Sequence, residues 1–599
     1  MSAPRVSYAE RDLSAYVPAT ETIYAAIVVD AVKGPVEKPI VPGNAPNFLK
    51  IFTPNEQIDI GMSTAHFSAL TVLEKYSSVV VVRAASADAR YSGALVNKDG
   101  TVVTASDIKD PSAVDMDDES FLIAAANQGL WGDELRFQVL GYKATETVAV
   151  TGGILKSTQK WGAGYPVKLA GSNLPAEVND YTTYFAVPAA GGIKLATSRA
   201  NATASTPVTL TVSDATGVIV SPAVEYTKIP NTFNLRVFKA DDLVNPVLDV
   251  IGSKINGLKD QDNKSLYIED VTADNIYAQV FNNPLNTDPV TDIVIPAALG
   301  GGSNGSPVTD GDCIRALNKL NNPREFAIKV IMNGGRTSQA YGSAIIALAE
   351  SRADCVGITS VPLTAQGGVS PAQSMVNYRK HDTNWDTSYA AMYAPHVKIY
   401  DRYNDRNLWV SPDGVATKAI FDTASNFEIW YPVGGNKRGV VNVLDTYVHL
   451  LDSDQDLLYD AGINPIVFEE GEGIKIWGQK TLQYASSMLD RLNVRLLLVT
   501  IGPAIRKLLA NFLFEFNDAD TRALAKGMVD TYMDSIMARR GVTKYVTICD
   551  DTNNTASDVD NHILRVSLLV CPNNSTEYIP LTIGITNNSV DFDLAAEAL

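Results

Sequence analysis

The clearest candidate for a chemical site is a serine that lies between glycines. Residues 301–305 read Gly-Gly-Ser-Asn-Gly, which fits the G-x-S-x-G pattern around the nucleophile of many serine hydrolases. That pattern needs a strand directly before the serine and a helix directly after it. Here glycine precedes Ser303, Ser306-Pro307 follow, and the Lys-Ser/Thr of a phosphate-binding loop is missing. We therefore expect a flexible loop without a nucleophile.

A second candidate is an acidic segment that begins like a calcium-binding loop. Residues 452–456 read Asp-Ser-Asp-Gln-Asp, so carboxylates alternate as the first ligands of such a loop do. Leu457 occupies the position of the turn-forming glycine, and Ile463 occupies that of the bidentate glutamate. Because the ligand set is incomplete, we predict a solvated acidic loop.

The other acidic and imidazole side chains form no recognisable metal or catalytic set. The acidic runs at 115–119 and 469–472 are typical of exposed turns, and ion pairs between subunits are the functional alternative. The histidines show no H-x-x-x-H spacing and are expected to be structural; they are His66, His381, His396, His449 and His562. The sequence therefore predicts no enzyme activity, no metal and no cofactor.

Charge and hydropathy exclude further classes of protein. The formal net charge is −18, whereas a nucleic-acid coat needs a basic face. Charged residues within the first twelve interrupt any signal peptide. The most apolar stretch, 495–514, contains Pro503, Arg506 and Lys507, so we predict a buried amphipathic helix rather than a membrane span. The cysteines are far apart and are expected to be reduced and mostly buried; they are Cys313, Cys355, Cys549 and Cys571.

The elements that would position these residues alternate between strands and helices in two separate parts of the chain. Residues 79–84 (Val-Val-Val-Val-Arg-Ala) suit a strand buried on both faces of an α/β sheet. Strands at 326–332 and 355–360 around a helix at 338–351 indicate a βαβ unit with a parallel sheet. Because about 240 residues separate these parts, we predict one α/β domain split by an insertion.

The insertion and the C-terminal part have different patterns. Val208, Leu210 and Val212 alternate with threonines, which predicts a half-buried strand in a β-sandwich-like insert at about 145–222. Long helices are predicted at 494–514 and 518–540, the second with Arg539 and Arg540 in its last turn and Gly541 as the C-cap. Strands are predicted at 545–549, 563–571 and 578–585.

Read in order, several segments resemble the contractile bacteriophage tail sheath family over most of the chain. The matching segments are Gly34-Pro35 and residues 79–84, 127–132, 265–269, 299–305, 388–395, 411–414, 463–466, 475–482 and 512–518. The order of these motifs carries the resemblance. Residues 430–435 (Trp-Tyr-Pro-Val-Gly-Gly) depart from the alanine-rich turn of the family, and the insertion differs in length.

The resemblance implies a mixed α+β and α/β multidomain fold, with a sheath core built from N- and C-terminal parts and inserted outer domains. The ranges assigned are an extended arm (1–22), a split α/β domain (23–92 and 306–485), an outer domain (93–144 and 223–305), the nested β-sandwich-like module (145–222), a tube-facing C-terminal domain (486–580) and a C-terminal arm (581–599).

The resemblance also implies a function. Such a subunit polymerises helically around a tail tube in a metastable extended state and contracts to drive the tube through the host envelope for genome delivery. The implied partners are further copies of the chain, the tail tube protein, and the baseplate and tail terminator proteins. Neither nucleic acid nor direct membrane insertion is expected. The protein would be part of the virion tail, assembled in the host cytoplasm.

Sheath subunits of this family donate strands from their arms to neighbouring subunits, and they face the tube with C-terminal helices. The residues that could act as strand donors here are Val6, Tyr8, Ile583, Ile585, Val590 and Phe592. The basic residues that could meet acidic groups of the tube are Arg506, Lys507, Arg522, Lys526, Arg539 and Arg540. The alternative is that these cations only solvate their helix faces.

Two other functions stay open on the sequence alone. A headless phage-derived contractile injection particle uses the same kind of sheath, and neighbouring capsid genes would separate the two. A surface adhesin or depolymerase is suggested only by the β-rich insert. That function predicts a signal peptide or a long repetitive shaft, and we expect neither.

Overall fold

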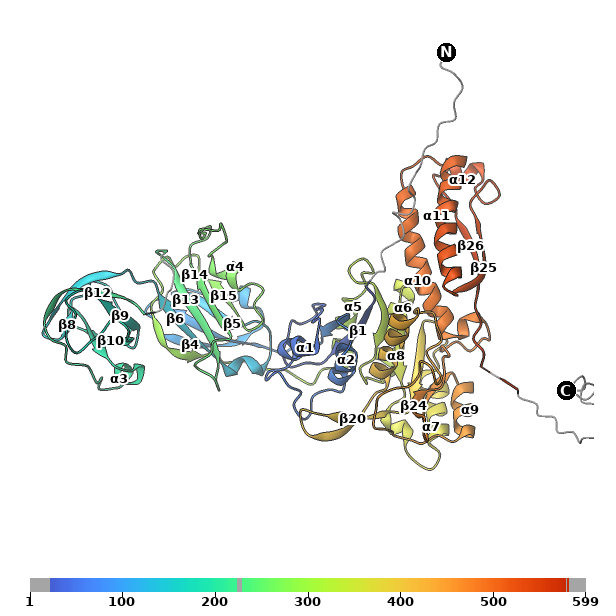
Figure 1. Ribbon diagram of the computed structural model, residues 1–599, viewed down its shortest axis with the longest axis horizontal. Helices are drawn as coiled ribbons and strands as arrows, with labels where there is room; N and C mark the ends of the chain where they lie inside the picture. Colours follow the sequence, from blue (N-terminus) through green and yellow to red (C-terminus); the bar gives the residue numbers. More distant parts are fainter. Residues whose placement is uncertain (1–21, 224–228, 578, 581–599) are drawn as a thin grey trace, which may run out of the picture.

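The computed structural model describes residues 22–223, 229–577 and 579–580, in four parts along an elongated molecule (Figure 1). A β-barrel forms one end, followed by a β-sandwich and an α/β domain. The C-terminal domain stands across the long axis at the other end. The six residues predicted to donate strands lie outside the described residues; they are Val6, Tyr8, Ile583, Ile585, Val590 and Phe592.

Two distant parts of the chain build one α/β sheet. Its strand order is β2-β1-β17-β18-β19-β23-β24, and all neighbours are parallel except β23 and β24. The strands are β1 (Tyr24–Val29), β2 (Val79–Arg83), β17 (Ile328–Met332), β18 (Val356–Ser360), β19 (Ala390–Ala394), β23 (Ile463–Glu469) and β24 (Gly473–Ile476). A small sheet, β20 (Val397–Asp401), β21 (Arg406–Val410) and β22 (Asp445–Thr446), lies beside it.

Helices cover both faces of this sheet, which explains the valine run. Val79 and Val81 belong to the core shared with α1, α2 and α8, whereas Val80 and Val82 belong to the core shared with α5 and α6. A strand buried on both faces shows a continuous apolar sequence, as predicted. The helices of the domain are α1 (Ala45–Phe52), α2 (Ala65–Leu73), α5 (Asp310–Asn318), α6 (Gln339–Arg352), α7 (Pro371–Asn377), α8 (Asp413–Asn426) and α9 (Asp452–Asp460).

The outer domain is itself the sandwich. Two antiparallel four-stranded sheets, β14-β13-β6-β16 and β15-β5-β3-β4, share one apolar core. Their elements are β3 (Tyr91–Asn97), β4 (Val102–Ile108), β5 (Glu119–Ala125), β6 (Leu135–Gly141), β13 (Phe233–Lys239), β14 (Leu248–Gly252), α4 (Ile268–Thr272), β15 (Ala278–Asn282) and β16 (Ile293–Ala298).

The nested module is a closed barrel, so the predicted β-sandwich-like module at 145–222 is wrong in architecture. Its strand order is β10-β11-β8-β7-β12-β9. The elements are β7 (Glu146–Thr151), β8 (Ile154–Leu155), β9 (Pro166–Ala170), β10 (Tyr184–Ala189), β11 (Gly192–Ala196), α3 (Arg199–Thr203) and β12 (Ala215–Pro222). Alternation reveals one buried face per strand but not whether the sheet closes on itself.

The strand predicted at Val208, Leu210 and Val212 does not form. The Leu210 N–H donates to the Leu195 carbonyl (2.7 Å) and Val212 is buried, but Val208 is exposed. The segment has no regular secondary structure, and the next strand, β12, starts only at Ala215. A single backbone hydrogen bond to β11 fixes it instead of a ladder.

The C-terminal domain is a helical hairpin backed by a two-stranded sheet. Its elements are α10 (Leu492–Leu509), the 3-10 turn η7 (Ala510–Phe512), α11 (Ala519–Ala538), β25 (Val542–Ile548), α12 (Ala556–Asp560) and β26 (Ser567–Pro572). Both predicted long helices are present. The strand predicted at 578–585 falls mostly outside the described residues. In the described part of the chain, no helix is both long and apolar enough to cross a membrane.

The end of α11 corrects the predicted cap. The left-handed residue is Arg540 (φ 61°) and not Gly541. The Arg540 N–H donates to the Met537 carbonyl and the Gly541 N–H to the Ile536 carbonyl, as in a Schellman motif. A side chain at position 541 would collide with Ile536, because a Cβ built there lies 2.5 Å from its Cγ2 atom. Gly541 is therefore needed for close packing, and Arg540 carries the strain.

Candidate interaction site at the base of the C-terminal domain

The serine motif lacks the geometry of a nucleophile. Ser303 forms an isolated β-bridge with Arg90, and its hydroxyl accepts a hydrogen bond from the Gly305 N–H (3.1 Å). The next helix, α5, begins only at Asp310. The sharp turn from strand to helix that exposes a catalytic serine is therefore absent here.

The acidic segment at 452–456 is not a loop, so that prediction is wrong. It forms the first turns of α9, where the Asp454 carboxylate accepts a hydrogen bond from the Leu451 N–H (3.2 Å). Carboxylates are favourable at this end because they face the positive pole of the helix dipole. Among the residues that the structure describes, no group of three His, Cys, Asp or Glu could hold a metal ion.

The acidic run at 469–472 pairs within the chain. Glu472 lies 2.6 Å from the ammonium of Lys475, and Glu469 contacts the same ammonium. The Asn436 side-chain oxygen accepts a further hydrogen bond from it (2.6 Å). Because Lys475 is almost completely buried, these contacts compensate for the loss of its hydration. The run is exposed and turns at residues 470–472, as predicted, and its carboxylates also pair with a lysine of the same chain.

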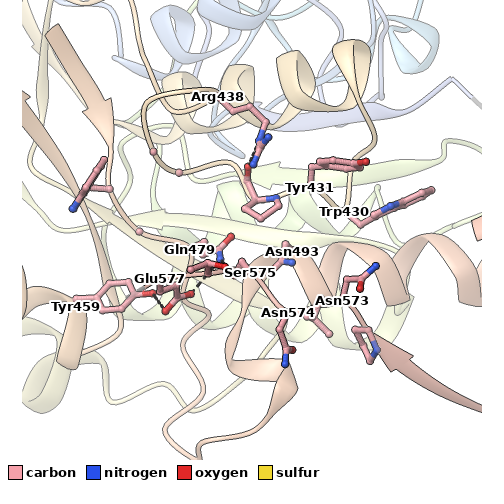
Figure 2. A pocket seen from close by; sticks show the side chains of 18 of the residues that line it. Trp430, Tyr431, Arg438, Tyr459, Gln479, Asn493, Asn573, Asn574, Ser575 and Glu577 are labelled. Carbon is pink, nitrogen blue, oxygen red and sulfur yellow. Dashed lines mark hydrogen bonds between the residues drawn. The ribbon is translucent and has the colours of Figure 1, made fainter. Parts of the chain in front are cut away.

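A large concave site lies where the C-terminal domain meets the α/β domain (Figure 2). We call it the basal groove, and its volume is about 1040 Å³. It is lined by side chains from five stretches: 430–438, 455–465, 477–497, 540–541 and 572–579. Apolar walls come from Trp430, Tyr431, Pro432, Pro465, Trp477, Val494 and Leu497. A groove of this size accepts a segment of protein chain rather than a single ion.

The last described segment of the chain lies in the groove and is held by Glu577. Its carboxylate accepts two hydrogen bonds from Arg491, at 2.6 Å from Nε and 2.8 Å from Nη2. The Tyr459 hydroxyl (3.0 Å) and the Gln479 amide (3.2 Å) donate to the same carboxylate, and Figure 2 shows this cluster. Burial alone would raise the pKa of Glu577, but the contacts with Arg491, Gln479 and Tyr459 together outweigh it, so the pKa is lowered.

A second set of contacts fixes the aromatic wall. The Trp430 indole N–H donates to the Arg539 carbonyl (3.3 Å), and the Arg539 guanidinium lies 5.1 Å from the centre of the Trp430 ring. Arg539 also pairs with Glu428 (3.0 Å). Arg438 stacks on Tyr431 at 5.6 Å. These contacts with arginine side chains therefore fix the orientation of the two aromatic rings.

The six predicted tube-facing cations do not form one patch. Arg522 pairs with Asp551 and donates to Asn517 (2.9 Å), and Arg539 is held as described above. Arg506 and Lys507 are exposed near the end of α10, Lys526 is half-buried on α11, and Arg540 lines the basal groove. Arg522 and Arg539 are about 25 Å apart along α11, so the set spans both ends of the hairpin.

Sequence reasoning missed most of the groove residues. Glu577, Arg491 and Tyr459 come from three distant segments, and no local pattern links them. One signal was present: residues 430–435, which depart from the pattern of the resembled family, form the aromatic wall. A segment that differs from the family pattern, between segments that match it, can therefore indicate a surface that is particular to this protein.

Within the described residues, the fold offers an open groove that holds a terminal segment and no catalytic or metal-binding set. Residues 307–482 match the family model described as the phage tail sheath protein central domain.

Named relatives agree with that match. The chain is 28% identical over 366 residues to a tail sheath protein of Enterobacteria phage T4, covering 58% of this chain and 55% of the relative. It is 30% identical over 320 residues to one of Vibrio phage KVP40, covering 49% and 47%. The matched part thus spans about half the length of these relatives. Residues 307–482 therefore resemble a phage tail sheath central domain, and the similarity to phage tail sheath proteins extends beyond these residues.

A solved structure supports the fold. A sheath tail protein from Listeria innocua superposes with a TM-score of 0.50, covering 92% of this chain and 96% of that one at 9% identity. At that identity the likeness concerns the fold alone. It confirms the predicted mixed α+β multidomain sheath fold.

Proposed function

We propose that the protein is the repeating subunit of a contractile tail sheath. It polymerises helically around a tail tube in a metastable extended state and contracts to drive the tube through the host envelope, delivering the genome. Its partners are further copies of itself, the tube protein, and the baseplate and tail terminator proteins. It is assembled in the host cytoplasm and becomes part of the virion tail.

The observation that carries this proposal is an incomplete sheet. Among the described residues, β25 and β26 pair only with each other, so each strand keeps one open edge. One face packs on the helical hairpin through Tyr545, Leu568 and Val570, whereas Val546 and Leu569 are exposed. Two strands alone are only marginally stable, and open edges are templates for pairing with another chain. The sheet has the form of an acceptor for strands of neighbouring subunits.

The arms supply the donors in this proposal. Residues 1–21 and 581–599 would each reach about 60 to 70 Å if extended, which is enough to cross to an adjacent subunit. Each backbone hydrogen bond that an added strand makes contributes about 1 kcal/mol net. A tethered strand keeps its pairing while the folded domains rotate as rigid bodies. Contraction then releases the energy difference between two packings of the same linked subunits, about a few kcal/mol per subunit.

Contact with the tube is assigned to part of the predicted basic set. Arg522 and Arg539 are already used in ion pairs inside the chain, so their substitution would damage the fold. Arg506 and Lys507 are exposed to solvent at the end of α10. We therefore place the tube-facing surface at this end of the hairpin.

Arm truncation tests the proposal. Electron microscopy of the purified full-length protein is expected to show regular hollow cylinders. Removing both residues 1–20 and 588–599 should abolish them while the thermal unfolding temperature changes little, because in this proposal the arms pair with neighbouring subunits rather than with their own domains. Ordered cylinders from the doubly truncated protein would falsify strand donation as the basis of assembly.

A further inference from the structure

The far end of the C-terminal domain exposes an unusual apolar surface. We call the loop between η7 and α11, residues 513–518, the apical loop. Leu513, Phe514 and Phe516 are exposed there, and Phe514 reaches 106% relative exposure. Phe514 also adopts a left-handed backbone (φ 71°), which is costly for an aromatic residue. Contiguous exposed apolar side chains of this size mark a contact surface.

The apical loop and the basal groove lie at opposite ends of the same helix. Helix α11 begins directly after the loop, at Ala519, and its C-terminal residues lead into Arg540 and Gly541 in the groove. The helix is about 30 Å long, so the loop cannot enter the groove of its own chain. Any contact between the two must join two copies.

The two surfaces carry complementary side chains, aromatic against aromatic and acidic against basic. The apical loop places Glu515 between two phenylalanines, Phe514 and Phe516. The basal groove has an aromatic wall and carries the side chains of Arg438 and Arg540. No ion pair to a carboxylate is present for either arginine within the described residues. Two carboxylates line the groove as well: Glu577 is already neutralised by Arg491, and Asp456 belongs to α9.

We propose that the apical loop of one copy docks into the basal groove of the next copy, with Phe514 and Phe516 against the aromatic wall and Glu515 facing Arg540 and Arg438. A second copy is the occupant because one chain carries both halves of the contact. Two different patches that meet head to tail generate a ring or an open helical polymer rather than a two-fold symmetric dimer. The inference rests on the proposed sheath function and adds a contact that does not involve the arms.

Cysteine crosslinking in assembled cylinders tests this contact. The background is Cys571→Ser, since Cys571 is exposed while Cys313, Cys355 and Cys549 are buried. Phe514→Cys and Trp477→Cys are added together, and a short bis-maleimide is applied to cylinders. A ladder of covalent oligomers is expected, because each copy links to the next. The matched control replaces Phe514→Cys with Tyr181→Cys, an aromatic of the barrel module that is 82% exposed, and should give no ladder.

Charge exchange gives an independent readout. Glu515→Lys is expected to raise the protein concentration needed for cylinder formation at least tenfold, and Arg540→Glu in the same chain should restore most of it. Cylinders that form without a ladder overturn the docking but leave the sheath function intact. A ladder in the control overturns it as well. If Phe514→Asp affects only co-assembly with a tube, the occupant is the tube. If the Cys571→Ser parent forms no cylinders, the sheath function fails together with the docking.

Discussion

The two main sheets of the molecule differ in whether their strands are fully paired within the chain. The seven-stranded α/β sheet pairs its central strands on both edges and is covered by helices on both faces. The β25–β26 sheet has two open edges and one bare face. The first is finished by the chain itself, although its strands are far apart in sequence. The second, in our proposal, is finished by a neighbour. The same kind of substitution should therefore prevent folding when it is made in the first sheet, but prevent only assembly when it is made in the second.

Aspartate in each sheet gives the largest contrast. Val80 in β2 is fully buried, so Val80→Asp places a carboxylate in a dry core and should cost about 4 kcal/mol or more, enough to prevent folding. Val546 in β25 is 53% exposed, and Val546→Asp should change the free energy of unfolding by only about 0.5 kcal/mol. The second variant should fold but fail to form cylinders. Urea unfolding and electron microscopy measure the two effects.

Either of two results would contradict the comparison. A Val80→Asp protein that unfolds with a normal midpoint would show that the core tolerates the charge. Normal cylinders from Val546→Asp would show that the bare face of β25 is not covered in the assembly.

The sequence predicted the first sheet well because its physics is local. Four consecutive valines and a helix between two short apolar runs identify a parallel, two-sided sheet without knowledge of distant partners. The barrel was misassigned because closure depends on how the first and last strands meet. Residues 452–456 were predicted to form a loop because most of them are acidic. Leu457 and Leu458, however, continue the same helix, α9. The prediction for this segment relied on its composition and not on the spacing of its apolar residues.

A buried cation at the junction between the α/β domain and the sandwich should give the next largest effect. The Arg83 guanidinium donates to the carbonyls of Ala31 (2.6 Å), Gly34 (2.7 Å) and Gln128 (2.9 Å). Arg83→Met leaves these acceptors without a donor and should cost about 2 to 4 kcal/mol. Urea unfolding measures this cost. Arg506→Met, at an exposed cation, is the matched control and should cost less than about 0.5 kcal/mol. Equal costs would contradict a structural role for Arg83.

The Glu577 ion pair should give a smaller, pH-dependent effect. Because the folded state lowers the pKa of Glu577 from its ordinary value of 4.5, the pair stabilises above that pH. Its contribution falls as the pH drops through the lower folded pKa. Glu577→Gln should cost about 1 kcal/mol at neutral pH and remove this part of the acid dependence. Urea midpoints measured at neutral and acidic pH test this.

Glu470→Gln, at an exposed carboxylate, is the control and should leave the acid dependence unchanged. An identical pH profile for Glu577→Gln and the parent would contradict a role for the pair in holding the terminal segment.

The basal groove could not be predicted, for a reason that applies to the whole candidate site. Its residues come from stretches that only tertiary packing brings together, and Arg539 shows the problem at a single position. In the sequence it resembles any cation in the last turn of a helix. In the fold it lies against Trp430 and pairs with Glu428, more than a hundred residues earlier in the chain. The pattern of charges in the sequence cannot distinguish a cation that connects two domains of the same chain from a cation that binds another protein.

The barrel should give the smallest effect on assembly, because a closed barrel has no open edge to offer a neighbour. The chain enters and leaves it side by side: the Tyr142 N–H donates to the Thr232 carbonyl (3.0 Å), and β6 pairs with β13 up to Gly141 and Phe233. Replacing residues 143–231 with Asn-Gly should close a hairpin between β6 and β13. The variant should form cylinders at the same protein concentration as the parent, with a thinner outer density in electron micrographs.

Two positions need repair in that variant, because Leu140 and Val294 of the sandwich contribute to the barrel core and would become exposed. Leu140→Thr and Val294→Thr restore a polar surface there, and the same pair of substitutions in the intact chain is the control for their own cost. If the shortened protein folds with normal stability but no longer polymerises, the barrel belongs to the lattice. A β-structure whose strands are all paired within the chain would then also be needed for assembly. The contrast between the two main sheets would not extend to the rest of the molecule.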